Sequence, residues 1–197
     1  MTELISGFDC FYEKFKSVVL SPQWLKLQSH FNDSNRILLV GNGGNLAVCD
    51  HGAIDIARLT NKSASAPGSG ILASSLINDA SHDLWVKNWL EICLRGLTTD
   101  LRKKTLLIGV SSSGYSKNIC LALEHALNSD CQAVLISAQK PKIEGSYITV
   151  ELDVDEYHTS EVLTLSLLYQ LIHSSGFQCP SISSASKSPK VLDYSSQ

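Results

Sequence analysis

The segment RILLVGNGG, from Arg36 to Gly44, predicts the architecture of this chain more clearly than any other. Its first five residues form an almost unbroken apolar run, which is typical of a parallel strand covered by helices on both faces. The glycines that follow let the backbone turn sharply. A helical pattern then extends from about Asn45 to Leu59. We therefore predict a strand, a tight loop and a helix in succession.

The same arrangement returns further along the chain. Thr105–Val110 reads TLLIGV, a serine-rich loop follows, and a second helical pattern runs from about Ser116 to Leu127. Strands that alternate with helices indicate a parallel sheet with helices on both faces. Three further strands complete the prediction, and they are expected at Gln132–Ile136, at Tyr147–Leu152 and, with a weaker pattern, at Ile71–Ala73. We predict a three-layer α/β sandwich with a five-stranded parallel sheet.

Helices are expected at both ends of this α/β core. Glu3–Phe31 carries aromatic and apolar residues at helical spacing, interrupted at Ser21-Pro22, and predicts one or two helices. His158–His173 is apolar nearly all the way round, so it is either deeply buried or sandwiched at a subunit interface. The last 24 residues include nine serines and are expected to be disordered. This organisation predicts a single domain over residues 1–173 and a tail over residues 174–197.

The overall composition excludes several classes of protein. The chain has 197 residues, and 16 Lys and Arg against 19 Asp and Glu give a net charge of −3, which argues against an electrostatic nucleic-acid binder. No apolar run approaches the roughly 20 residues that span a bilayer, and the first residues lack the pattern of a secretory signal. The six cysteines form no CxxC pair, as expected for reduced thiols. We expect a cytoplasmic protein.

The two loops after the strands suggest a phosphate site. In an open parallel sheet, ligands bind at the carboxyl ends of the strands. The loop SSSGYS, from Ser111 to Ser116, offers hydroxyls and backbone N–H groups at the start of a helix, which favour an anion. Neither a GxxxxGK[ST] nor a GxGxxG motif is present, so the loops suit a small phosphomonoester better than a nucleotide.

These paired loops resemble those of the SIS (sugar isomerase) domain, and within it the phosphoheptose isomerase group. The resemblance extends from about Arg36 to Ile172 and includes an Asn-Asp pair followed four residues later by Asp, at Asn78, Asp79 and Asp83. It implies a phosphorylated sugar as ligand. Residues implied to bind this ligand are Asn42, Gly43, Gly44, Asn45, Asp79, Ser111, Ser112, Ser113, Ser116 and Asp155.

The resemblance also implies catalytic and metal-binding positions. His51 and Asp55 match a His and a Glu that serve the family in proton transfer and as zinc ligands, and their i, i+4 spacing places them on one helix face. A possible third ligand is His158. The family's final histidine has no counterpart, because the two registers considered place Ser166 or Leu168 there. Either one zinc ion per subunit binds to this altered set, or the metal has been lost.

Two functions therefore remain open on the sequence. One is an aldose–ketose isomerase acting on sedoheptulose 7-phosphate or a similar ketose phosphate. The other is a non-catalytic SIS module that binds a phosphosugar or a protein partner, as in the DnaA initiator-associating type. The resemblance further implies a homodimer or homotetramer with sites shared between subunits. No direct contact with nucleic acid or membrane is expected.

Overall fold

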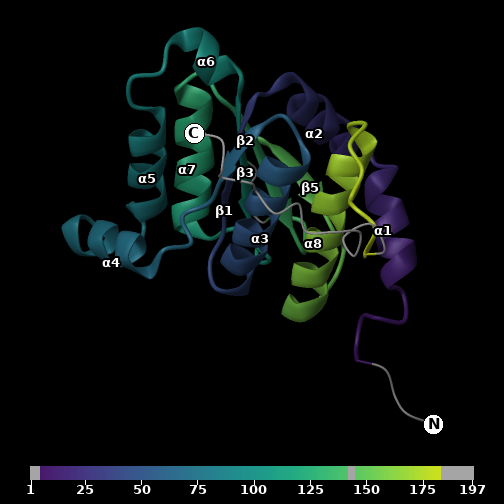
Figure 1. The fold of residues 1–197 in the computed structure, drawn as a ribbon. Helices are drawn as coiled ribbons and strands as arrows, with labels where there is room; N and C mark the ends of the chain where they lie inside the picture. The colour runs from purple at the N-terminus through teal and green to yellow at the C-terminus, as the bar shows by residue number, and fades with distance from the viewer. Residues whose placement is uncertain (1–4, 142–144, 183–197) are drawn as a thin grey trace, which may run out of the picture.

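The structure is a computed structural model that describes residues 5–141 and 145–182. A parallel sheet of five strands forms its centre, as predicted, and Figure 1 shows helices on both of its faces. The strands lie in the order β2-β1-β3-β4-β5. This order reverses between β1 and β3, so ligands are expected to bind at the carboxyl ends of these two strands. The strand bounds are β1 Arg36–Val40, β2 Ser63–Ser65, β3 Thr105–Val110, β4 Gln132–Ser137 and β5 Ile148–Glu151.

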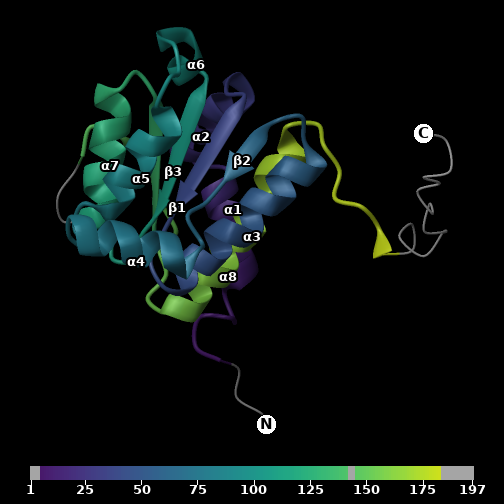
Figure 2. The same ribbon diagram turned by 60° about the vertical axis from the view of Figure 1, so that its left-hand side comes forward.

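The helices divide between the two faces of the sheet. The first set packs around α3 and α8, and the second around α5 and α7, as Figures 1 and 2 show from two directions. The three-layer sandwich is therefore confirmed. On one face lie α1 Phe11–Val19, α2 Pro22–Asp33, α3 Gly44–Leu59 and α8 Tyr157–Ser174, and on the other lie α4 Gly70–Asp79, α5 Trp85–Leu94 and α7 Lys117–Asn128, while α6 Thr99–Lys103 precedes β3.

Alternation along the strands produces two separate cores. In β1, Ile37 and Leu39 pack among α2, α3 and α8, whereas Leu38 and Val40 pack against α5 and α7. All four side chains are fully buried. Because successive side chains of a strand point to opposite faces, a strand buried on both sides must be apolar throughout. This requirement explains the unbroken apolar run from which the strand was predicted.

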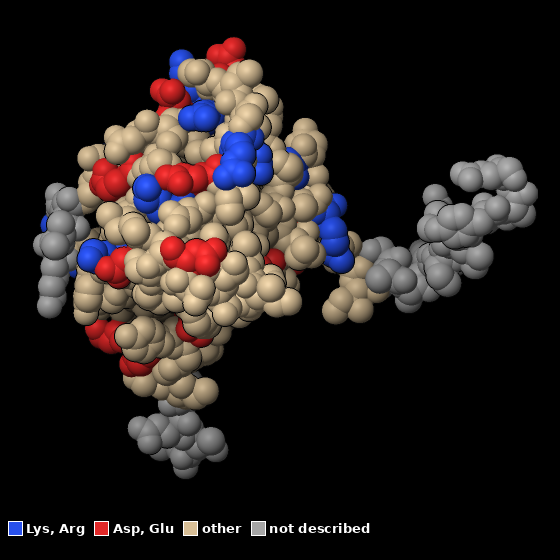
Figure 3. Space-filling view, turned by 90° about the vertical axis from the view of Figure 1, so that its left-hand side faces the viewer, with Lys and Arg blue, Asp and Glu red and all other residues tan. Residues whose placement is uncertain are grey.

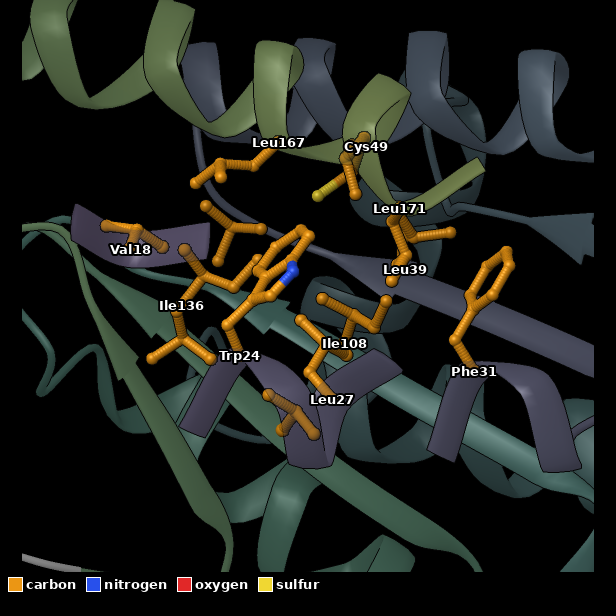
Figure 4. Close-up of a cluster of buried hydrophobic side chains, with 14 of the residues drawn as sticks. Val18, Trp24, Leu27, Phe31, Leu39, Cys49, Ile108, Ile136, Leu167 and Leu171 are labelled. Atoms are coloured by element: carbon orange, nitrogen blue, oxygen red, sulfur yellow. The ribbon is translucent and has the colours of Figure 1, made fainter. Parts of the chain in front are cut away.

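The N-terminal region forms two helices. Leu20 is the C-cap of the first. Ser21 caps the second, because its Oγ accepts a hydrogen bond from the Trp24 N–H at 3.1 Å. Pro22 occupies the first helical position, where its missing N–H costs nothing. In Figure 4, Trp24 and Phe31 of α2 point into the core between the sheet and α8.

One predicted strand is wrong. Ile71–Ala73 belongs to α4, and the remaining strand of the sheet is Ser63–Ser65 instead. This strand pairs with β1 along one side and lies at the sheet's edge, so its short serine-containing sequence needs no apolar side chains. The apolar residues of α4 had suggested a buried strand, yet none of them is fully buried, and Ile71 is 85% exposed.

The last helix is buried along one side rather than all round. Pairs of residues that recur every turn face the core, and the exposed side includes Tyr157 and Val162. Beyond it, Phe177 packs against the same core. Residues 183–197, most of the predicted tail, lie outside the described residues. Among the helices that the structure describes, none is long and apolar enough to cross a bilayer.

A buried lysine, Lys62, lies beside the connection from α2 to β1. The Lys62 ammonium donates to the carbonyl oxygens of Asn32 and Ser34, at 3.2 and 2.6 Å, and lies 5.0 Å from the centre of the Phe31 ring. Burial lowers the pKa of this amine. The ammonium serves as a hydrogen-bond donor to the carbonyl groups at the end of α2 and in the chain directly after it.

We expect Lys62→Met to lower the free energy of unfolding by about 1–3 kcal/mol, because both carbonyl groups lose a charged donor. Urea unfolding followed by circular dichroism would measure the change. The matched control is Lys103→Met on exposed α6, with an expected change within about 0.5 kcal/mol. Equal stabilities for the two variants would contradict the role given to Lys62.

Candidate active site

The glycine loop and the serine loop meet at the carboxyl ends of neighbouring strands. Gly43 has a left-handed φ of 55°, and Gly44 leaves no room for a Cβ beside the carboxylate of Glu161 in α8. Asn42 exchanges two amide hydrogen bonds with Asn118 of α7, at 3.0 and 2.8 Å. The glycine loop is thus fixed to the helix that follows the serine loop.

The serine loop is held by its own hydroxyls and by β4. Ser111 Oγ donates to Ser116 Oγ at 2.8 Å, and Gly114 has a φ of 72° that closes the turn. The Ser111 N–H donates a hydrogen bond to the Ile136 carbonyl oxygen in β4. Because α7 begins directly afterwards, at Lys117, its unpaired N–H groups and its dipole favour an anion here.

A buried polar chain joins the two loops to the last helix. Asn45 Nδ2 donates to Ser112 Oγ at 3.1 Å, and Ser112 Oγ lies 3.1 Å from Ser160 Oγ. All three residues are at most 8% exposed. Asn45 Oδ1 is buried without a partner in the described parts of the chain. A buried amide oxygen normally finds a donor, so this oxygen suits a hydroxyl group of a ligand.

A second polar cluster lies further along α3. His51 Nε2 and Asp55 Oδ2 are 3.2 Å apart, and the Tyr169 hydroxyl lies 3.0 Å from the first and 2.8 Å from the second. Arg58 approaches Asp55 Oδ1 at 3.5 Å. Burial and the hydrogen bond to Asp55 raise the pKa of Tyr169 to about 12, so its hydroxyl stays protonated at neutral pH. Beside His51 lies a hollow of about 520 Å³, which Ile54 and Gly68 also line.

The remaining predicted residues have polar partners other than the members of these two clusters. His158 stacks on Phe8 at 5.9 Å, and its Nε2 lies 3.2 Å from the Ser6 carbonyl oxygen. Asp155 accepts a hydrogen bond from Gln139 at 2.7 Å. Asp79 ends α4, is exposed and accepts a hydrogen bond from the Asn78 amide.

The zinc set predicted from His51, Asp55 and His158 is not assembled within one chain. Over residues 5–141 and 145–182, no three His, Cys, Asp or Glu side chains lie close enough to hold a metal ion. Structural and catalytic zinc sites in proteins use at least three protein ligands. The residues present therefore do not fit a zinc ion within one chain.

Surface charge does not form a basic patch on the face shown in Figure 3, where Lys and Arg alternate with Asp and Glu. Several of these charges pair across or along helices. Lys117 lies 2.7 Å from Asp83, and Lys87 lies 2.8 Å from Glu91. Lys117, which directly follows the serine loop in the sequence, thus already has a carboxylate partner.

Three polar residues of the two clusters were not anticipated. Asn118 and Ser160 reach the loops from α7 and α8, and Tyr169 reaches α3 from α8. Tyr169 stands in an otherwise leucine-rich helix, and a partly buried tyrosine usually needs a hydrogen-bond partner. That rule indicates a partner for Tyr169, but it does not say which residue.

Comparisons with known proteins identify phosphoheptose isomerases of similar sequence. No family model matches the sequence. The phosphoheptose isomerase of Syntrophotalea carbinolica is 27% identical over 135 residues, which are 66% of this chain and 65% of that protein. The phosphoheptose isomerase of Helicobacter pylori is 26% identical over 173 residues, covering 80% of this chain and 86% of that protein.

Solved structures show the same fold. The phosphoheptose isomerase of Neisseria gonorrhoeae superposes with a TM-score of 0.68 at 18% identity, over 84% of this chain and 91% of that one. The enzyme of Francisella tularensis has the same TM-score at 14% identity, over 86% and 94% of the two chains. The chain therefore has the fold of these phosphoheptose isomerases, and phosphoheptose isomerases are among the proteins that it resembles in sequence.

Proposed function

We propose that this protein is a sugar-phosphate isomerase that interconverts a ketose phosphate, such as sedoheptulose 7-phosphate, and its aldose isomer. The observation that carries this proposal is the serine loop, joined through Asn45, Ser112 and Ser160 to the glycine loop and the last helix. The names of the similar proteins support the same activity. They do not favour the alternative of a binding module without catalysis.

The proposed chemistry needs a phosphate anchor and a proton carrier. The serine loop would hold the phosphate through hydroxyls and N–H groups, and the amides of Asn42 and Asn45 would orient the sugar hydroxyls. Aldose–ketose isomerisation removes a proton from the carbon beside the carbonyl and returns it to the neighbouring carbon through an enediol. His51 and Asp55 are the titratable pair available on the same helix.

The two clusters are separated along α3. At 1.5 Å per residue, His51 lies roughly 9 Å beyond Asn45 along the helix axis. The hollow beside His51 is lined by α3 and by the connection to α4, and the serine loop does not line it. We infer that a second subunit completes the site, in a homodimer or homotetramer. The exposed side chains of Ile71 and Val162 offer apolar surface for such contacts.

A cytoplasmic location is part of the same proposal. Six unpaired cysteines support it, since disulfides are rare in the reducing cytoplasm. Cys49 and Cys131 are buried, and burial raises the pKa of both thiols, that of Cys131 to about 11. These two thiols therefore stay protonated and behave as small apolar side chains.

A binding and turnover experiment tests the phosphate anchor. Ser113 is the variant of choice, because its half-exposed hydroxyl makes only long contacts of 3.4 and 3.5 Å within the loop. We expect Ser113→Ala to raise the Kd for sedoheptulose 7-phosphate by roughly 10- to 100-fold, through loss of a hydrogen bond to a charged group. Calorimetry gives the Kd, and a ketose-to-aldose assay gives the turnover.

Ser75→Ala, on exposed α4, is the matched control and should bind as the wild type does. An unchanged Kd in Ser113→Ala would contradict the placement of the phosphate. Tight binding by the wild type without turnover of any ketose phosphate would instead favour the binding module.

A further inference from the structure

The hydroxyl of Tyr169 lies between the two residues that were expected to bind a metal. It is 3.0 Å from His51 Nε2 and 2.8 Å from Asp55 Oδ2, and the two rings meet edge to face at 89°. The carboxylate and the imidazole are themselves 3.2 Å apart, so the three polar atoms form a closed triangle. The tyrosine thus contacts the same nitrogen and oxygen that a bound cation would use.

Counting hydrogens in this triangle fixes the form of the imidazole. A phenol has one hydrogen, and Tyr169 donates it to Asp55 Oδ2. The His51 Nε2 therefore faces two oxygens that act as acceptors, and it must carry a hydrogen itself. Neutral His51 is then protonated at Nε2, and its Nδ1 holds the free lone pair. The His51 side chain is 54% exposed, beside the hollow described above.

This arrangement does not suit a metal ion held between the two side chains. A zinc-bound histidine offers a bare ring nitrogen at about 2.0–2.1 Å from the ion. Here Nε2 carries a hydrogen, and Asp55 Oδ2 already accepts from the phenol. The buried carboxylate side chain is 13% exposed and has Arg58 on its other oxygen. The two atoms that face each other, His51 Nε2 and Asp55 Oδ2, are thus occupied within the chain.

We propose that Tyr169 takes the place of a metal ion at His51 and Asp55, so that this pair acts in the proposed reaction without metal. Tyr169 is a positioning residue, because it fixes the imidazole and the carboxylate. The catalytic part of this proposal rests on the proposed isomerase function.

The first test needs no turnover. The full-length wild type is equilibrated with a slight excess of zinc chloride, desalted and analysed for metal by mass spectrometry, and the His51 ring nitrogens are observed by ¹⁵N NMR. We expect much less than one zinc per chain and a neutral ring protonated at Nε2. One zinc per chain that disappears in His51→Ala, or a neutral ring protonated at Nδ1, would overturn the proposal.

The second test uses turnover. We expect wild-type activity to be unchanged by EDTA, and Tyr169→Phe to lose roughly 10- to 100-fold in kcat with KM within about two-fold, as for loss of a hydrogen bond to a charged group. The control is Tyr157→Phe, an exposed tyrosine on the same helix. Activity abolished by EDTA, or full activity in Tyr169→Phe, would overturn the role of Tyr169. A wild type without isomerase activity refutes the proposed function, while the zinc and NMR results still decide whether Tyr169 replaces a metal.

Discussion

Replacing His51 with glutamine is expected to lower kcat for ketose–aldose isomerisation by about 10²- to 10⁴-fold, the usual contribution of a general acid–base group. Glutamine can keep a hydrogen bond to the Tyr169 hydroxyl, but it cannot take up and return a proton. The KM should change little, because the proposed phosphate anchor lies in the serine loop and not beside His51. Steady-state assays with sedoheptulose 7-phosphate separate the two constants.

The matched control for this variant is His125→Gln. His125 lies in the last turn of α7, and its closest polar contacts are long, 3.5 Å to Ser129 and 3.6 Å to Glu91. Its replacement should leave kcat within about two-fold, since no reacting atom lies near it. Equal activity of the two variants would show that His51 carries no proton in the reaction.

Trp24→Ala should cause the largest loss of stability, about 3–5 kcal/mol, and should lower the Tm by roughly 6–20 °C. Trp24 is 1% exposed and belongs to the core that joins α2 to the sheet and to α8. Figure 4 shows its ring between the sheet residues Ile108 and Ile136 and Leu167 of α8. Truncation leaves a cavity among rigid elements that close it only in part. Differential scanning calorimetry measures the change.

Two control variants test whether the loss of stability in Trp24→Ala comes from the buried volume that is removed. Trp24→Phe should cost less than about 1.5 kcal/mol, because the ring still fills the site and the lost indole N–H has no partner in the described chain. Leu25→Ala, on the 57% exposed neighbour, should stay within about 0.5 kcal/mol. A loss in Leu25→Ala as large as that in Trp24→Ala would mean that buried volume does not account for the effect.

Most of the fold was predictable because burial constrains sequence strongly at the centre of a parallel sheet. β1, β3 and β4 are covered on both faces, so each had to be an apolar run, and each was found within one residue of its observed bounds. The constraint of burial on the sequence is weaker at the edge of the sheet. β2 pairs on one side with three residues of no marked pattern, while the apolar Ile71 occupies an exposed helix.

The candidate site was predictable where it is local in sequence. The glycine loop, the serine loop and the i, i+4 pair of His51 and Asp55 each arise from neighbouring residues, and the structure assembles them. Contacts between distant segments left no such signal. His158 is held by the Ser6 carbonyl and the Phe8 ring, from a segment about 150 residues away, and nothing in the helix pattern indicates that.

The exposed position of α4 lowers the free energy that is needed to unfold this helix, compared with the rest of the domain. This helix has no buried residue and packs mainly on α5, through Leu72, Ala73 and Leu76. It can therefore open while the sheet and both cores stay intact, since few apolar contacts are lost. We therefore expect the segment between β2 and α5 to open at a lower free energy than the rest of the domain. Such opening would leave the global stability of the domain almost unchanged.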